Sequence, residues 1–149
     1  MHNSTTPVPN YFFDVHLKTL KSAELKVLLV ITRQTYGWED KKTDTGRKKL
    51  DWISGSQLQS RTGCSKRAIS SAIDVLARNN LIKVFDDKGN QLYTPEQRQG
   101  KTRLYYHVCS LVENQVNITP TSAKFAQDIS KIVSQLVQKM HITKLILQN

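Results

Sequence analysis

Residues 54–85 read SGSQLQSRTGCSKRAISSAIDVLARNNLIKVF, and this stretch decides the fold. Ser54 and Gln57 have the spacing of a capping box, in which a hydroxyl and a side-chain amide cap the first turn of a helix reciprocally. Gly63 predicts the end of that helix, because a residue without a β-carbon adopts the left-handed conformation easily. Ser65 predicts the N-cap of a second helix. A strand follows, so the order predicts a helix-turn-helix with a wing.

The second of these helices has two different faces. Positions about 100° apart around the axis place Ile69, Ala72, Ile73 and Leu76 on one apolar stripe, which we expect to face the core. The opposite face is basic at its ends and carries short side chains in its middle, which allow close approach to base edges. It is either a solvated face or a DNA-reading face, and the turn before it favours DNA. The candidate DNA contacts here are Ser65, Lys66, Arg67, Ser70, Ser71, Asp74 and Arg78.

Two strands are expected after this helix. Residues 81–85 and 102–108 have strand character, and the second alternates apolar with polar side chains. Residues 86–101 between them are rich in turn formers and long for a simple hairpin turn. The wing lies along a phosphate backbone or a minor groove, or else it is only an exposed loop. Its candidate phosphate contacts are Lys88, Arg98, Lys101 and Arg103.

Upstream of the motif, residues 22–36 predict a helix with Ser22 as its N-cap and Gly37 as its C-terminal stop. Its apolar side chains surround the axis, which indicates a buried central helix. Residues 39–49 form a polar loop with five basic side chains, and we hold a solvated loop and a phosphate-contacting loop to be equally supported. Lys48 and Lys49 are the candidate contacts in this loop.

The N-terminal residues divide into two parts. Residues 1–10 are polar and contain two prolines, so we expect an extended, flexible arm. Residues 11–20 carry a dense apolar patch that must pack on some other surface, formed by Tyr11, Phe12, Phe13, Leu17 and Leu20.

Residues 110–120 look like a linker, and residues 121–149 return to helical periodicity. Their apolar side chains recur at steps of three and four, so the helix needs a partner surface. That surface is its own domain or a second copy, and we favour a dimer, because a two-fold dimer matches a pseudo-palindromic DNA site. The candidate dimerisation residues are Phe125, Ile129, Ile132, Val133, Leu136 and Met140.

The composition narrows the function. The chain has 149 residues with 22 Lys and Arg against 12 Asp and Glu, a net charge of +10, which favours a polyanionic partner. Its two cysteines are far apart and form no metal-type cluster, so we expect no metal and no cofactor. The N-terminus lacks a signal pattern and no apolar run approaches membrane-span length, which indicates a cytoplasmic protein without membrane contact.

Catalysis is not expected from this sequence. Its four histidines are scattered and none has a neighbouring nucleophile or carboxylate pair in a recognisable spacing, and the GxxxxGK[ST] phosphate loop is absent. We therefore do not expect an enzyme.

Four segments carry a resemblance to a known family, and they read PNYFFD (9–14), AELKVLLVITRQTYGW (23–38), DWIS (51–54) and SQLQSRTGCSKRAISSAIDVLARNNLI (56–82). Together, over about residues 8–108, they resemble the N-terminal domain of the bacteriophage replication protein O family. The resemblance implies a winged-helix, origin-binding domain of a phage or mobile-element replication initiator. It also implies a dimer on repeated or palindromic sites and a recognition helix at residues 65–79.

Initiators of that family continue into a region that recruits the replicative helicase or its loader, and 149 residues leave no room for one. We therefore expect either a piece of a longer initiator or a small relative that kept DNA binding. Replication or mobile-element proteins are the further candidate partners.

The sequence thus predicts a mainly α fold with a small β hairpin, a winged helix-turn-helix over residues 11–109 and a C-terminal amphipathic helix. We expect sequence-specific binding of double-stranded DNA in replication initiation. A winged-helix transcriptional regulator is an alternative with the same chemistry, and a protein-interaction winged-helix module is an alternative of another class.

Overall fold

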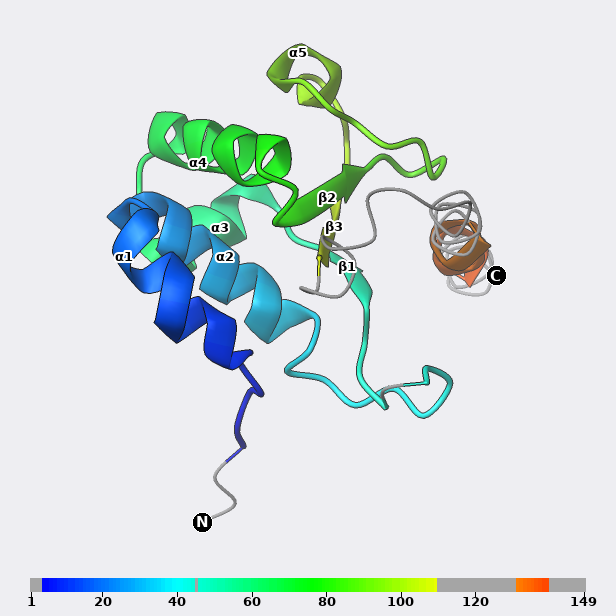
Figure 1. The fold of residues 1–149 in the computed structure, drawn as a ribbon. Coiled ribbons are helices and arrows are strands. Elements are labelled where there is room, and N and C mark those ends of the chain that lie inside the picture. Colours follow the sequence, from blue (N-terminus) through cyan, green and yellow to red (C-terminus); the bar gives the residue numbers. More distant parts are fainter. Residues whose placement is uncertain (1–3, 45, 110–130, 140–149) are drawn as a thin grey trace, which may run out of the picture.

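The computed structural model describes residues 4–44, 46–109 and 131–139 (Figure 1). Helices dominate, and three short strands form one antiparallel sheet, so the predicted mainly α fold with a small β component is confirmed. None of the described helices is long and apolar enough to cross a membrane. In chain order the elements are a π-helical turn η1 (Phe12–His16), α1 (Leu17–Thr19), α2 (Ser22–Gln34), β1 (Leu50–Trp52), α3 (Gly55–Thr62), α4 (Lys66–Arg78), β2 (Ile82–Phe85), α5 (Pro95–Arg98) and β3 (Tyr105–Val108).

Helix α2 is the central element of the core. Val27, Leu28 and Ile31 on α2 are fully buried, and α3, α4 and β3 all contact this helix. Removal of such side chains from water stabilises the fold by roughly 1.5–3 kcal/mol each. The predicted buried central helix is therefore confirmed.

The ends of α2 differ slightly from the prediction. The N-cap is Lys21 rather than Ser22, because the carboxylate of Glu24 accepts a hydrogen bond from the backbone N–H of Lys21 at 2.8 Å. The helix ends at Gln34 rather than at residue 36, since Thr35 already leaves helical geometry. The backbone N–H and the hydroxyl of Thr35 both donate to the carbonyl of Ile31, at 3.0 Å and 2.9 Å.

Helix α4 packs one face on α2. Its stripe of Ile69, Ala72, Ile73 and Leu76 is buried, as the sequence predicted. The stripe belongs to the main core cluster together with the buried residues of α2. Burial of this stripe turns the opposite, polar face of α4 away from the core.

The motif helices begin and end where the sequence predicted. Ser54 accepts a hydrogen bond from the backbone N–H of Gln57, and the Gln57 side chain accepts one from the N–H of Ser54, both at 3.1 Å. Gly63 ends α3 in the left-handed conformation with φ of 70°. Ser65 then caps α4 by accepting from the N–H of Ala68 at 3.2 Å.

The sheet has the strand order β1-β3-β2, so it is larger than the expected hairpin. The sequence did not predict that β1 pairs with β3, opposite Tyr106 and its neighbours. One face of the sheet, with Val84 and Tyr106, packs on the helices. The other face carries Leu50, Phe85 and Tyr105.

Residues 131–139 are helical and cover this second face of the sheet, on the side opposite α2 and α4 (Figure 1, orange). Val133 is completely buried with Leu50, Phe85 and Tyr105, and the half-buried members of the same cluster are Trp52, Ile132, Leu136 and Val137.

This packing corrects the sequence prediction for Ile132, Val133 and Leu136, which were expected in a dimer interface but contact their own sheet. The physical reason is that β1, β2 and β3 present an apolar face to the helix at residues 131–139. Phe125, Ile129 and Met140 lie outside the described residues, as do the expected linker 110–120 and residues 121–130, so dimerisation through them stays a prediction.

The N-terminal patch is only partly buried. Phe12 is buried and Leu20 packs partly on the core, whereas Phe13 and Leu17 are each 58% exposed. The patch thus packs on the core through Phe12 and Leu20 alone, because the single turn of η1 presents only one side to the core. Residues 4–9 contain no helix or strand, and Val8 among them packs on the core.

Replacement of Gly63 tests the turn between α3 and α4. Gly63→Ala should lower the free energy of unfolding by about 1 kcal/mol, because an L-residue is strained at φ of 70°. Gly55→Ala is the matched control, since Gly55 has ordinary φ and no atom lies within 4 Å of the added β-carbon. It should leave the stability unchanged or raise it by up to about 1 kcal/mol. Urea unfolding of both variants measures this, and equal losses in the two would contradict the assignment.

Candidate nucleic-acid interface

The exposed face of α4 forms an open hollow of about 630 Å³ on the surface. Four of the predicted contacts, Lys66, Arg67, Ser70 and Ser71, are exposed and line it together with Asp74 and Pro95. Ser65 is exposed at the N-cap, and Arg78 is exposed at the other end of the helix. The structure therefore brings the predicted α4 residues together on one accessible surface.

Asp74 is the acidic group on this face, and two arginines neutralise it. Arg78 on the next turn lies 2.9 Å from one carboxylate oxygen, and Arg98 from α5 lies 3.2 Å from the other. An anionic ligand is therefore not repelled by an unpaired carboxylate at this point of the helix. Asp74 fixes the positions of Arg78 and Arg98 beside this surface, and we do not propose it as a DNA contact itself.

Arg98 occupies a different place from the one expected. Its side chain is only 7% exposed and pairs with Asp74, so Arg98 fastens α5 to α4 instead of standing in solvent on the wing. Arg98 is therefore not available as a surface phosphate contact, contrary to the prediction. Burial of a guanidinium requires such a paired carboxylate, because an isolated buried charge is strongly unfavourable.

Helix α5 itself was missed in the sequence, although a signal was present. Thr94 accepts a hydrogen bond from the N–H of Gln97, the Gln97 side chain caps back on Thr94, and Pro95 occupies the first turn. This is the capping box with an N-terminal proline that marks a helix start. The long connection between β2 and β3 is therefore partly ordered by a helix.

Asp86 organises the turn at the start of that connection. Its carboxylate accepts hydrogen bonds from the backbone N–H of Lys88 at 3.0 Å and of Asn90 at 2.9 Å, and from the Asn90 side chain at 3.2 Å. Lys101 lies 3.4 Å away as an ion-pair partner. Burial by itself would raise the pKa of Asp86, but the hydrogen bonds from Asn90, Lys88 and Lys101 outweigh burial and lower it.

The wing residues are thus not equivalent. The side chain of Lys88 is exposed, whereas Lys101 is engaged with Asp86. The Arg103 guanidinium stacks over the ring of Trp52 with 5.1 Å from its central carbon to the ring centroid. A cation held over an aromatic face keeps its charge and gains a fixed position.

Lys48 and Lys49 are not part of the α4 surface. The Nζ of Lys48 lies 2.8 Å from a carboxylate oxygen of Asp51, and that of Lys49 lies 3.6 Å from Asp44. Neither lysine lines the hollows beside α4. The structure therefore separates the predicted contacts of this loop from those of the helix.

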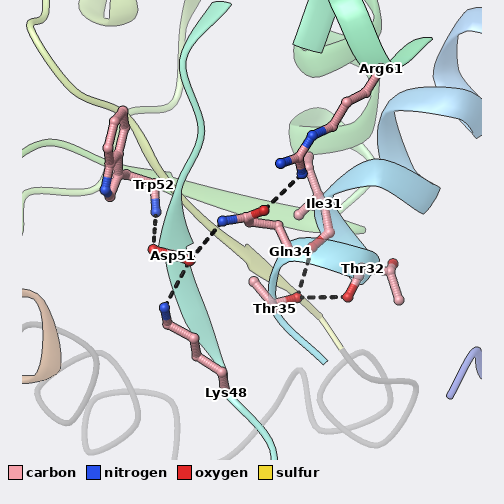
Figure 2. Close-up of polar contacts among 8 residues, drawn as sticks. All are labelled: Ile31, Thr32, Gln34, Thr35, Lys48, Asp51, Trp52 and Arg61. Carbon is pink, nitrogen blue, oxygen red and sulfur yellow. Dashed lines mark hydrogen bonds and ion pairs between the residues drawn. The ribbon is translucent and has the colours of Figure 1, made fainter. Parts of the chain in front are cut away.

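Figure 2 shows that Asp51 belongs to a polar network between three elements. Gln34 at the end of α2 donates to Asp51 on β1 at 2.9 Å and accepts from Arg61 on α3 at 2.8 Å. The backbone N–H of Trp52 donates to the second oxygen of Asp51 at 2.8 Å. The network ties the first motif helix to α2 and the sheet, and sequence reasoning missed it because no local pattern joins residues so far apart.

Metal binding has no support in the described part of the chain, where no group of three or more His, Cys, Asp or Glu side chains could hold an ion. Cys64 and Cys109 are both free thiols.

Asp86→Ala tests the turn after β2. It should lower the free energy of unfolding by about 2 kcal/mol at neutral pH, because several donors lose a buried acceptor. Since folding lowers the pKa of Asp86 from its usual 3.8, its contribution is present above pH 3.8 and is lost as pH falls through the folded pKa. The difference between wild type and variant should therefore shrink in acid. Asp87→Ala, at an exposed neighbour, is the control and should stay near wild type. A difference in the free energy of unfolding between wild type and Asp86→Ala that stays constant down to acidic pH would contradict this role.

The sequence of this chain matches a known protein family. The model of the family described as bacteriophage replication protein O matches residues 3–92, which is more than half of the chain. No curated protein and no solved structure matches the chain. The matched range includes both motif helices and β2, and it agrees with the resemblance that the sequence carries. The chain belongs to the bacteriophage replication protein O family, whose role lies in phage replication.

Proposed function

We propose that the protein binds double-stranded DNA sequence-specifically at a replication origin of a phage or mobile element. In this proposal α3 and α4 are a helix-turn-helix, α4 enters the major groove, and β2 and β3 with their connection are a wing. The element order α2, β1, α3, α4, β2, β3 and the sheet order β1-β3-β2 support a winged-helix arrangement.

The observation that carries the proposal is the exposed face of α4. Ser70 and Ser71 in its middle are short, so the helix backbone can approach base edges closely. Lys66 and Arg67 stand at its first turn, where recognition helices make base and phosphate contacts. The net charge of +10 supplies the general attraction to a polyanion.

The wing is proposed to contact the backbone. Lys88 is exposed at the turn after β2, and Arg103 is held just before β3 by its stack on Trp52. Contacts of this type position a protein on the duplex but carry no direct sequence information. Lys101 contributes less, because Asp86 already neutralises it.

Other functions fit the observations less well. A transcriptional regulator would use the same surface, and the phage replication family favours the origin instead. A protein-interaction module would leave the basic face of α4 without a purpose.

Binding without catalysis is proposed because two histidines serve the fold. His16 is buried between Tyr11 and Phe12, and burial lowers its pKa. His107 is buried with Nδ1 2.8 Å from the carbonyl oxygen of Lys49.

Selection of duplexes from a random pool, followed by affinity measurement at several salt concentrations, tests DNA binding. If about six phosphates are neutralised, the logarithm of the association constant should fall against log salt with a slope of about −5. A slope near zero, or the absence of a bound sequence at low salt, would contradict the proposal.

Substitution on α4 and on the wing tests the division of roles. Arg67→Ala and Ser71→Ala should each weaken binding to the selected site by about 1–3 kcal/mol and change non-specific binding little. Lys88→Ala is the matched surface control and should weaken all sequences evenly, because it removes one phosphate contact. Titrations with the selected duplex and with a scrambled one measure both effects. Similar behaviour of the two classes would show that α4 does not read the bases.

A further inference from the structure

A cavity of about 620 Å³ opens between α3, α4 and the segment from α5 to β3. It has the size of a small-molecule site, since such sites usually range from about 300 to 1,000 Å³. Part of its wall is apolar and comes from the core, formed by Ile53, Leu58, Ile69, Ile73, Leu104 and Tyr106. An apolar body would therefore find a matching surface here.

The polar part of the wall is cationic. Lys66, Lys101 and Arg103 line the cavity, and Glu96 is its one acidic lining residue. Arg98 lines it as well, with a side chain that is more than nine-tenths buried. Asp74 pairs with Arg98 and Asp86 pairs with Lys101, but the cations of this wall still outnumber the carboxylates beside it. A negatively charged group inside the cavity would therefore meet a net positive charge in a partly dehydrated place, where the attraction is strong.

Arg98 also has an unused donor. Its Nη2 donates to Asp74 at 3.2 Å, but its buried Nη1 has no hydrogen-bond partner within the described residues. A buried donor on a charged group that lacks an acceptor destabilises the fold, so an unpaired one in a native structure calls for an acceptor. Tyr106 lines the same cavity and stays a neutral hydroxyl, because burial raises its pKa far more than nearby Arg98 lowers it.

We propose that this cavity binds an amphipathic organic anion, with a flat apolar body against the core wall and a carboxylate or phosphate group against the cationic wall of Lys66, Arg98 and Arg103. The inference rests on the cavity and on Arg98, and it does not require that α4 binds DNA. A mononucleotide and an aromatic carboxylate share this chemistry, so both serve as probes.

The chain contains its own reporter for the site. It has two tryptophans, and Trp52 lines the cavity whereas Trp38 does not. Trp38 is 54% exposed, so Trp38→Phe removes the unwanted signal with little effect on the core. Fluorescence of the Trp38→Phe protein then reports Trp52 alone, in the absence of DNA.

The first experiment titrates this protein with salicylate and with thymidine monophosphate, and with their uncharged counterparts salicylamide and thymidine. At least one anion should give a saturable change with a dissociation constant below about 10 mM. It should bind at least about tenfold more tightly than its uncharged counterpart, because the charge-assisted bond to Arg98 is lost in the latter. No saturable change with either anion, or equal affinity of charged and uncharged probes, would overturn the proposal.

The second experiment uses variants in the same background. Arg98→Met should weaken the anion about tenfold or more, whereas Asp74→Asn should tighten it, because the carboxylate of Asp74 competes for the same guanidinium. Lys88→Ala, outside the cavity lining, is the control and should not change the affinity. Circular dichroism checks the fold of both variants. If neither folds, Lys66→Ala, which removes an exposed cation from the cavity lining, decides and should weaken the anion. Undiminished binding by folded Arg98→Met, no gain in folded Asp74→Asn, or undiminished binding by Lys66→Ala contradicts the proposal.

Discussion

The rest of the structure depends on the packing of one apolar stripe of α4 against α2. Ile69 and Leu76 of that stripe are buried with Val27 and Ile31 of α2 in the main core cluster. Burial of the stripe fixes the rotation of α4 about its axis, so the polar side chains on its other face must point outward. The left-handed turn at Gly63 then sets where α3 lies relative to α4. The candidate interface is a consequence of this packing and needs no further element to expose it.

Two ion pairs hold the connection between β2 and β3 in place, beside the buried side chain of Leu92. Arg98 on α5 forms an ion pair with Asp74 on α4. At the other end of the connection, the carboxylate of Asp86 binds the backbone N–H groups of Lys88 and Asn90 and pairs with Lys101. Asp74 and Asp86 therefore pair with Arg98 and Lys101, whereas the side chain of Lys88 stays exposed. The basic side chains that a sequence presents as one set therefore divide into structural and surface groups.

The caps and ends of the helices were predictable from the sequence, whereas the surface on which each element packs was not. The caps at Ser54 and Ser65 and the stop at Gly63 depend on atoms within a few residues, so composition and spacing reveal them. The same logic would have found α5 at Thr94 if the capping box there had been recognised.

Contacts across the fold carry no such signal. The link from Arg61 through Gln34 to Asp51 joins three elements that only the tertiary fold brings together. An apolar stripe shows that residues 131–139 need a partner, but it does not show which partner, and Val133 contacts its own sheet. In the sequence, Arg98 did not differ from the other basic residues between β2 and β3. Its partner Asp74 lies 24 residues away, so no local pattern predicts that the two side chains pair.

The most direct test of the central claim is a map of backbone amide NMR signals of the ¹⁵N-labelled chain with and without a duplex selected for binding. The account predicts the largest shift changes at Lys66, Arg67, Ser70 and Ser71, on the face of α4 that points away from the core. It predicts little change at Ser134 and Gln135, on the helix behind the sheet. Large changes elsewhere with an unperturbed α4 would contradict the claim that this helix is the DNA-reading element.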